Sequence, residues 1–193
     1  SLILILLVFV PMLLCVAFMT IIERKAMGSM QRRIGPNVVG YYGVLQPFAD
    51  ALKLVVKEQI IPAQSNKALF FLAPMISLVF SLLGWATIPF GSGMAITDIS
   101  LGMLFSLAVS SIGVYGALFA GWAANSKYAF LGSLRSTAQM VSYELIFSTC
   151  VAAVILLAGS LNFTTIVEAQ TSIWFIVPLF PLFIMYLISA LAE

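Results

Sequence analysis

Glu144 is the residue whose position most directly suggests chemistry. It interrupts an otherwise apolar run over residues 137–158 with a single carboxyl group. A charge near the middle of a membrane-spanning helix costs at least about 2.5–3.5 kcal/mol on insertion scales, so such residues face a protein interior and commonly move protons or ions. The alternative interpretation is a protonated glutamate hydrogen-bonded to Tyr143, Ser142 or a neighbouring helix. We favour the functional interpretation.

Two further acids occupy positions that local structure explains poorly. Asp50 lies near Lys53 and Lys57 on the polar side of a two-faced segment, where an acid gains nothing from anionic lipid. A pairing with Lys53 would contribute only a few tenths of a kcal/mol. Glu193 follows a long apolar run, at the end of a helix where basic residues are preferred.

Other kinds of chemistry are excluded by what the sequence lacks. It has no histidine and only two cysteines, Cys15 and Cys150, each in an apolar run. Histidine-based catalytic triads and histidine-ligated haem or zinc therefore cannot come from this chain. An iron–sulfur cluster usually needs four thiolates. No metal site, phosphate-binding glycine loop or nucleophile–base arrangement is predicted, so we expect no catalytic residue and no redox centre within the chain.

The elements that position these acids are predicted to be membrane-spanning helices. Charged residues make up 8% of the 193 residues and hydrophobic residues 62%, too apolar a balance for a water-soluble domain. Continuous apolar runs exclude a β-barrel, whose strands alternate. The predicted fold is an all-α polytopic membrane protein, one membrane domain over residues 1–193. Its five predicted spans are 2–22, 69–90, 99–124, 137–158 and 173–192.

The distribution of basic residues predicts the orientation of these spans. All nine lie in two connections, between spans one and two and between spans three and four. Alternating spans place both connections on one side of the membrane, and the positive-inside rule makes it the inner side. The N-terminus is therefore predicted to lie outside.

The first inner connection, residues 23–68, is predicted to contain an amphipathic helix over about 44–60. Apolar residues recur there at helical spacing, and Pro47 suits a first helical turn. The helix could simply lie on the inner leaflet. Alternatively, it could line the entrance to a site for an amphiphilic ligand.

Capping patterns predict where the helices begin. Ser136 with Gln139 fits a capping box, which places Glu144 roughly 12 Å into the membrane from the inner side. Asp98 is similarly placed to be the N-cap of the third span.

Three stretches of the chain have a distinctive pattern of residues. They are Glu23-Arg24-Lys25, Gly28, Met30-Gln31, Arg33, Gly35-Pro36-Asn37, Gly40, Gly43, Gln46-Pro47, Ala49-Asp50, Lys53-Leu54, Lys57-Glu58 and Pro62; then Gly121-Trp122-Ala123, Asn125-Ser126-Lys127-Tyr128, Gly132, Leu134-Arg135, Ala138-Gln139 and Ser142-Tyr143-Glu144; then Ser189-Ala190-Leu191-Ala192-Glu193. This pattern resembles chain 1 of NADH:ubiquinone oxidoreductase, the respiratory complex I, and the match extends over essentially all 193 residues.

This resemblance implies a role for particular residues. Arg24, Arg33, Phe48 and Asp50 would belong to the chamber that takes up ubiquinone, and to its entrance. Asp50, Glu144 and Glu193 would belong to a path of carboxylates that couples quinone reduction to proton translocation.

The resemblance also implies the surroundings of the chain. It would be part of an H⁺-translocating NADH:ubiquinone reductase in the mitochondrial inner membrane or, alternatively, the bacterial plasma membrane. Ubiquinone would be its substrate, with FMN and iron–sulfur clusters only in partner subunits. Its partners would be the hydrophilic quinone-module subunits, small membrane subunits and lipids, with no nucleic acid.

Family members continue beyond the position of Glu193 with an acidic inner loop and three more spans, so the chain is expected to lack a C-terminal part. Two alternatives stay open: a proton-coupled secondary transporter built around Glu144, and the membrane subunit of an energy-converting hydrogenase. The transporter is less favoured because no internal repeat is found. The basic Gly-Pro-Asn segment favours the quinone enzyme over the hydrogenase.

Overall fold

The computed structural model describes residues 2–91 and 94–192, and every regular element in them is helical. The predicted all-α fold is confirmed for this part of the chain. Two compact units are present, residues 1–60 and 61–193, and each is described by itself. The single membrane domain predicted from the sequence therefore stays a prediction.

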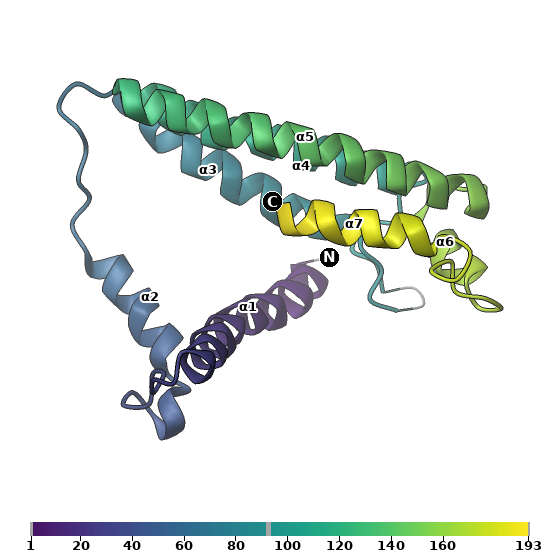
Figure 1. The fold of residues 1–193 in the computed structure, drawn as a ribbon, viewed down its shortest axis with the longest axis horizontal. Coiled ribbons are helices and arrows are strands. Elements are labelled where there is room, and N and C mark those ends of the chain that lie inside the picture. Colours follow the sequence, from purple (N-terminus) through teal and green to yellow (C-terminus); the bar gives the residue numbers. More distant parts are fainter. Residues whose placement is uncertain (1, 92–93, 193) are drawn as a thin grey trace. The chain divides into compact units, whose positions relative to one another are not determined.

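The first unit is a long helix followed by a looped segment and a short helix (Figure 1). Helix α1 covers Leu2–Met30 and continues past the predicted end at residue 22. Charged residues at positions 23–25 mark where an apolar run ends, but they are good helix formers and do not stop the helix. A 3₁₀ turn, η1 (Tyr41–Gly43), leads into α2 (Gln46–Val56), which has Pro47 in its first turn. The predicted amphipathic helix is present but shorter than residues 44–60.

The loop between α1 and α2 folds back on the end of α1. The Arg33 amide donates to the Gly28 carbonyl at 2.9 Å, and the Leu45 amide donates to the Val39 carbonyl at 3.2 Å. Gly43 adopts a φ of +75°, and a Cβ there would collide with the Pro36 carbonyl. Glycine is therefore required at this position both for its backbone angle and for the available space.

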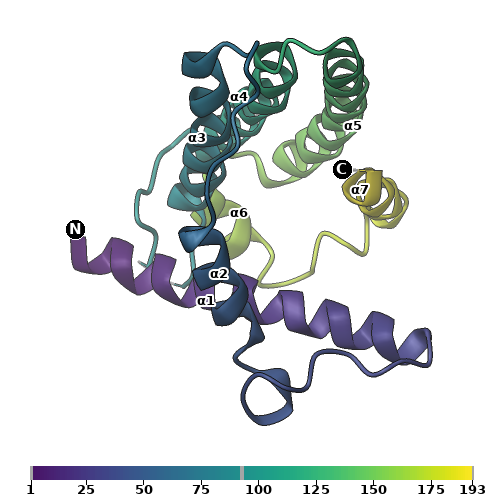
Figure 2. The ribbon, with the colours of Figure 1, turned by 90° about the vertical axis from the view of Figure 1, so that its left-hand side faces the viewer.

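The second unit contains three long helices side by side and one shorter helix packed against the last of them. Helix α4 lies between α3 and α5, and α7 runs along α5, an order that is also visible after a 90° turn (Figures 1 and 2). The elements are α3 (Lys67–Leu83), η2 (Gly84–Thr87), α4 (Gly102–Ala123), α5 (Lys127–Ala158), α6 (Phe163–Ala169) and α7 (Phe180–Ala192).

Small residues on α4 allow its neighbours to approach closely. A Cβ at Gly116 would meet Ser77 of α3, and one at Gly121 would meet Ser133 of α5. Such contacts are typical of helices that associate in membranes, where packing replaces the hydrophobic effect. Most large apolar side chains are exposed rather than buried, including Leu78 and Leu156, as expected for helices surrounded by lipid.

Among residues 2–91 and 94–192, four helices are long and apolar enough to cross a membrane, judged by length and composition: Ile3–Met30, Lys67–Thr87, Gly102–Ala123 and Lys127–Ala158. The fifth apolar helix, α7, begins seven residues later than the predicted span, because residues 171–179 form turns. Pro178 and Pro181 lack amide donors, which prevents a regular helix before Phe180.

Helix α5 begins at Lys127, ten residues before the predicted start of the fourth span. The predicted N-cap at Ser136 is therefore wrong, because Ser136 lies inside the helix. The hydropathy pattern marks where side chains become polar, whereas the helix extends back to Lys127. Asp98 is not an N-cap either, since Leu101 holds that position before α4.

Candidate functional site

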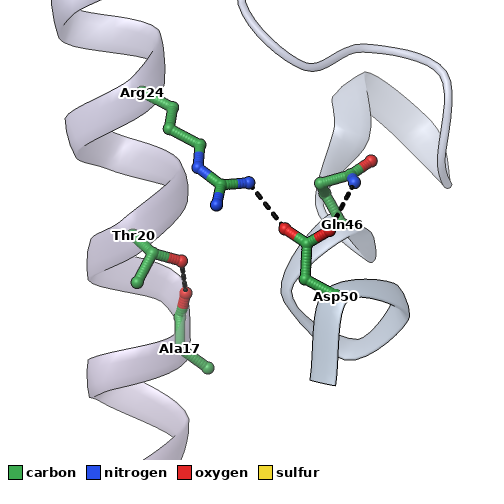
Figure 3. A network of polar contacts seen from close by, with 5 residues as sticks. All are labelled: Ala17, Thr20, Arg24, Gln46 and Asp50. Carbon is green, nitrogen blue, oxygen red and sulfur yellow. Dashed lines mark hydrogen bonds and ion pairs between the residues drawn. The ribbon is translucent and has the colours of Figure 1, made fainter. Parts of the chain in front are cut away.

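The first polar site joins the end of α1 to α2 through Asp50 (Figure 3). The Arg24 guanidinium Nη1 lies 2.6 Å from Asp50 Oδ2, and Gln46 Nε2 donates to Asp50 Oδ1 at 3.1 Å. These two hydrogen bonds, the one from Arg24 first, lower the pKa of the Asp50 carboxyl below its ordinary value. Asp50 is therefore held as a carboxylate.

Local sequence explains how these groups meet. Gln46 and Asp50 are four residues apart and share one face of α2. Phe48 packs edge-on against Phe18 of α1, with ring centroids 6.1 Å apart. This aromatic contact fixes α2 against α1 so that Asp50 comes within reach of Arg24. The side chains of Arg24 and Asp50 remain 49% and 35% exposed, which leaves the ion pair accessible to a ligand.

The loop before α2 adds further cationic groups, with different partners. The Lys25 ammonium donates to the Tyr42 carbonyl and lies 5.6 Å from the centre of the Tyr42 ring. Arg33 Nε donates to Gln31 Oε1 at 2.7 Å. Of the four predicted chamber residues, Arg24, Phe48 and Asp50 thus lie together, whereas the hydrogen bond of Arg33 goes to a neighbour in its own loop.

The second polar site lies in the other unit, at the middle of α5. Ser110 and Ser111 of α4 both donate to Glu144 Oε1, at 2.5 and 2.9 Å. Glu144 is partly buried. Of the two partner types considered from the sequence, a neighbouring helix is the one observed. Glu193, predicted to belong to the same proton path, lies outside the described residues.

Two grooves meet at the residue beside Glu144. One, of about 330 Å³, lies among α3, α4 and α5 and is lined partly by serines. The other, of about 310 Å³, lies between α5 and α7. Tyr143 lines both of them. The polar centre of this unit is therefore bordered by space on two sides of α5.

Sequence reasoning missed Ser110, Ser111 and Gln46 as partners of the acids. The spacing of Gln46 and Asp50 was a usable signal, because residues four apart on a helix are neighbours. Nothing in the sequence could pair Ser110 with Glu144, since that contact depends on how α4 and α5 are aligned. In residues 2–91 and 94–192, no cluster of three or more Cys, Asp or Glu side chains is arranged to hold a metal ion.

The fold and these sites define a class: a polytopic α-helical membrane protein in which hydrogen bonds between helices hold single carboxylates. A family model described as NADH dehydrogenase matches residues 3–193. The chain belongs to this NADH dehydrogenase family.

Relatives in fungi and bacteria agree with this membership. The chain is 72% identical over 189 residues to the NADH-ubiquinone oxidoreductase chain 1 of Mycosarcoma maydis, which covers 98% of this chain and 57% of the relative. It is 61% identical over 193 residues to the protein of the same name from Podospora anserina, covering 100% and 53%. It is 56% identical over 189 residues to a subunit of the NADH-quinone oxidoreductase of Rhodospirillum centenum, covering 98% and 56%. The chain thus spans somewhat more than half the length of these relatives.

Proposed function

We propose that this chain is part of the membrane subunit of a proton-pumping NADH:quinone oxidoreductase, and that it contributes to the quinone chamber and to proton transfer. The observation that carries the proposal is the family match over residues 3–193 together with relatives that are named as subunits of that enzyme. The partners would be the other subunits of the complex and the surrounding lipid.

The first unit has the chemical features that an amphiphilic quinone requires. The Arg24–Asp50 pair, with Gln46, offers hydrogen-bond donors and acceptors for a polar headgroup. On α2, the apolar side chains of Leu52 and Val55 are 67% and 82% exposed and could contact an isoprenoid tail. Pockets for such ligands combine an apolar lining with a few placed polar groups. In this proposal Arg33 and Phe48 belong to the chamber entrance.

Reduction of a quinone to a quinol takes up two electrons and two protons at the headgroup. The electrons would come from FMN and iron–sulfur clusters in partner subunits. The resulting change of charge would act on Asp50 and, through the proton path, on Glu144 and Glu193. A carboxylate within a membrane-spanning helix is a natural relay group, because it can gain and lose a proton in a part of the membrane where few other side chains can.

The location follows from the same proposal. Relatives occur in fungi and in bacteria, so the membrane would be the mitochondrial inner membrane or the bacterial plasma membrane, and we favour the former. The basic connections would face the matrix and the N-terminus the intermembrane space.

Replacement of Glu144 by glutamine tests the proton role. Glu144→Gln keeps the shape of the side chain and its acceptor oxygen but cannot release a proton. We expect NADH:quinone turnover coupled to proton pumping to fall at least tenfold. NADH:ferricyanide reduction by the peripheral arm and assembly on a blue-native gel should be preserved. Glu168→Gln on α6 is the matched control, and pumping by Glu144→Gln at the control level would refute the proton role.

Replacement of Asp50 by asparagine tests the chamber. Asp50→Asn removes the charge partner of Arg24 while keeping a similar shape, so we expect a raised KM for a short-chain ubiquinone. Asp98→Asn, which changes an acid elsewhere in the chain, is the control. An unchanged KM and unchanged sensitivity to inhibitors that block quinone access would contradict the chamber assignment.

A further inference from the structure

The hydrogen bonds around Glu144 are unusual because each donor has a choice of acceptors. Ser110 Oγ lies 2.5 Å from Glu144 Oε1 and 3.1 Å from the Leu107 carbonyl oxygen. Ser111 Oγ lies 2.9 Å from the same carboxylate oxygen and 3.0 Å from the same carbonyl. A serine hydroxyl has one proton to donate, so each serine can satisfy only one of its two acceptors at a time.

The two choices correspond to the two protonation states of the carboxyl group. When Glu144 is ionised, both hydroxyls can turn to Oε1 and stabilise its charge. When Glu144 is protonated, its own O–H can donate to a serine oxygen while the serines donate to the Leu107 carbonyl. Serines in apolar helices commonly bond to their own backbone in this way. Ser110 and Ser111 therefore do not depend on Glu144, whereas the ionised carboxylate depends on them.

We propose that Ser110 and Ser111 are positioning residues for Glu144, a hydroxyl pair that follows its protonation state by switching between Glu144 and the Leu107 carbonyl. This inference rests on the proposed proton role of Glu144. It adds that α4, which contains no charged residue, helps to determine when α5 gains or releases a proton.

The groove among α3, α4 and α5 borders one member of this pair, Ser110. Ser110 lines that groove, together with Ser106 one turn before it on α4. Ser77 and Ser81 line it from α3, also one turn apart. A volume of about 330 Å³ holds several water molecules, at about 30 Å³ each. Ser110 thus touches both the proton-carrying group and a space from which a proton could arrive.

A test by pH has to take account of the other groups around Glu144. The charged residues of the packed helices lie toward their ends or on the short α6. The titratable and charged groups on α3, α4, α5, α6 and α7, as far as these helices are described, are Lys67, Tyr115, Lys127, Tyr128, Arg135, Tyr143, Cys150, Glu168 and Tyr186. All of these groups are the same in the wild type and in the serine variants. A difference between their pH profiles of coupled turnover can therefore be assigned to the changed hydroxyls.

The test removes both hydroxyls in the full-length subunit of the assembled complex. In the double variant S110A/S111A the ionised carboxylate loses two donors, so the acidic limb of the pH profile of coupled turnover should move toward higher pH. The loss of one hydrogen bond to a charged group corresponds to a displacement of the profile by roughly one to two pH units, so S110A/S111A should show at least this much. The variant S110T/S111T keeps both hydroxyls and should restore the original profile.

The matched control removes two consecutive hydroxyls from α5 itself. Ser148 and Thr149 donate to the carbonyls of Leu145 and Ile146, so S148A/T149A should leave the profile in place. A profile for S110A/S111A that coincides with this control would overturn the proposal, as would failure of S110T/S111T to restore it. If S110A/S111A does not assemble, the single variant Ser111→Ala should show a smaller displacement in the same direction, and no displacement would count against the proposal.

Glu144→Gln, measured in parallel, separates the proposed proton role of Glu144 from the proposed role of Ser110 and Ser111. If Glu144→Gln pumps protons normally and the serine variants keep the wild-type pH profile, both the proposed proton role and this inference are refuted. Loss of pumping in Glu144→Gln, with the wild-type pH profile in S110A/S111A, would remove only the role of the serines.

Discussion

Replacing Gly121 by alanine should weaken the contact of α4 with α5, because the added methyl group has no space. A Cβ at this position would stand 2.9 Å from the Ala129 carbonyl oxygen and closer still to the Cβ and Oγ atoms of Ser133. Two of these atoms are a backbone oxygen and a Cβ, which cannot rotate away. The clash can therefore be relieved only by moving one helix.

The expected cost follows from that geometry. Carbon atoms pack best at about 3.5–4.0 Å, so α4 and α5 would have to separate by more than about 1 Å. Overpacking of this kind typically costs about 1–3 kcal/mol. Alanine recovers roughly 0.5–1 kcal/mol through its better helix propensity. Because three atoms lie too close, the cost at Gly121 should be in the upper part of that range, about 2–3 kcal/mol. The net loss of stability for Gly121→Ala should then be about 1–2.5 kcal/mol.

The assay is a heat series on isolated membranes, followed by mild detergent extraction and immunoblotting of the chain that stays soluble. Gly121→Ala should lower the midpoint temperature. Gly132→Ala is the matched control, because a Cβ at Gly132 on α5 meets no atom within 4 Å; its midpoint should stay unchanged or rise slightly. Adding Ser133→Gly to Gly121→Ala removes both clashing side-chain atoms and should recover part of the loss. A midpoint for Gly121→Ala equal to that of Gly132→Ala would refute the reasoning.

The remaining predictions concern the first unit and can be read from hydrogen exchange of the α2 amides. Because hydrogen bonding by Arg24 lowers the pKa of Asp50 in the folded chain, the ion pair should stabilise the α1–α2 contact fully above the ordinary value of 3.8. That stabilisation should be lost as the pH falls through the lowered value. Asp50→Asn should speed exchange already at neutral pH. Phe48→Ala should also speed it, through loss of the edge contact with Phe18, worth about 0.5–1.5 kcal/mol. Gly43→Ala should speed exchange of the α2 amides more strongly than Phe48→Ala, because its methyl group would collide with the Pro36 carbonyl. Unchanged exchange in Gly43→Ala would contradict the loop geometry described above.

The sequence predicted the helices better than their ends. Apolar runs locate the centres of the long helices because the backbone must satisfy its own hydrogen bonds in lipid. They do not locate the ends, because a helix continues wherever its next residues tolerate helical angles, as α5 does back to Lys127. The opposite error occurred at α7, where proline delays the helix although the composition stays apolar.

The sequence draws attention to Asp50 and Glu144 but not to the side chains that contact them. Glu144 stands out in the sequence because it is a single acid in an apolar run, and Asp50 because it lies among lysines. Their partners could not be read in the same way. Arg24 is 26 residues from Asp50, and Ser110 is 34 residues from Glu144. Such pairs depend on the alignment of two helices. The nearby Lys53, considered as a partner for Asp50, is only a minor cause of the lowered pKa of Asp50.

The hydrogen bonds of Asn162 bear on whether this chain could carry a sugar. Asn162-Phe163-Thr164 has the form of an N-glycosylation acceptor, in which the side-chain nitrogen of the asparagine is the atom modified. That nitrogen donates to Asp98 Oδ1 at 2.8 Å, while the side-chain oxygen caps α6 by accepting from the Thr164 amide at 2.8 Å. A glycan on this nitrogen would replace one of its two hydrogens and would crowd the contact between the two connections that carry Asp98 and Asn162. Asn162 therefore has a structural role in the folded chain, as the N-cap of α6 and the partner of Asp98, that does not depend on any attached sugar.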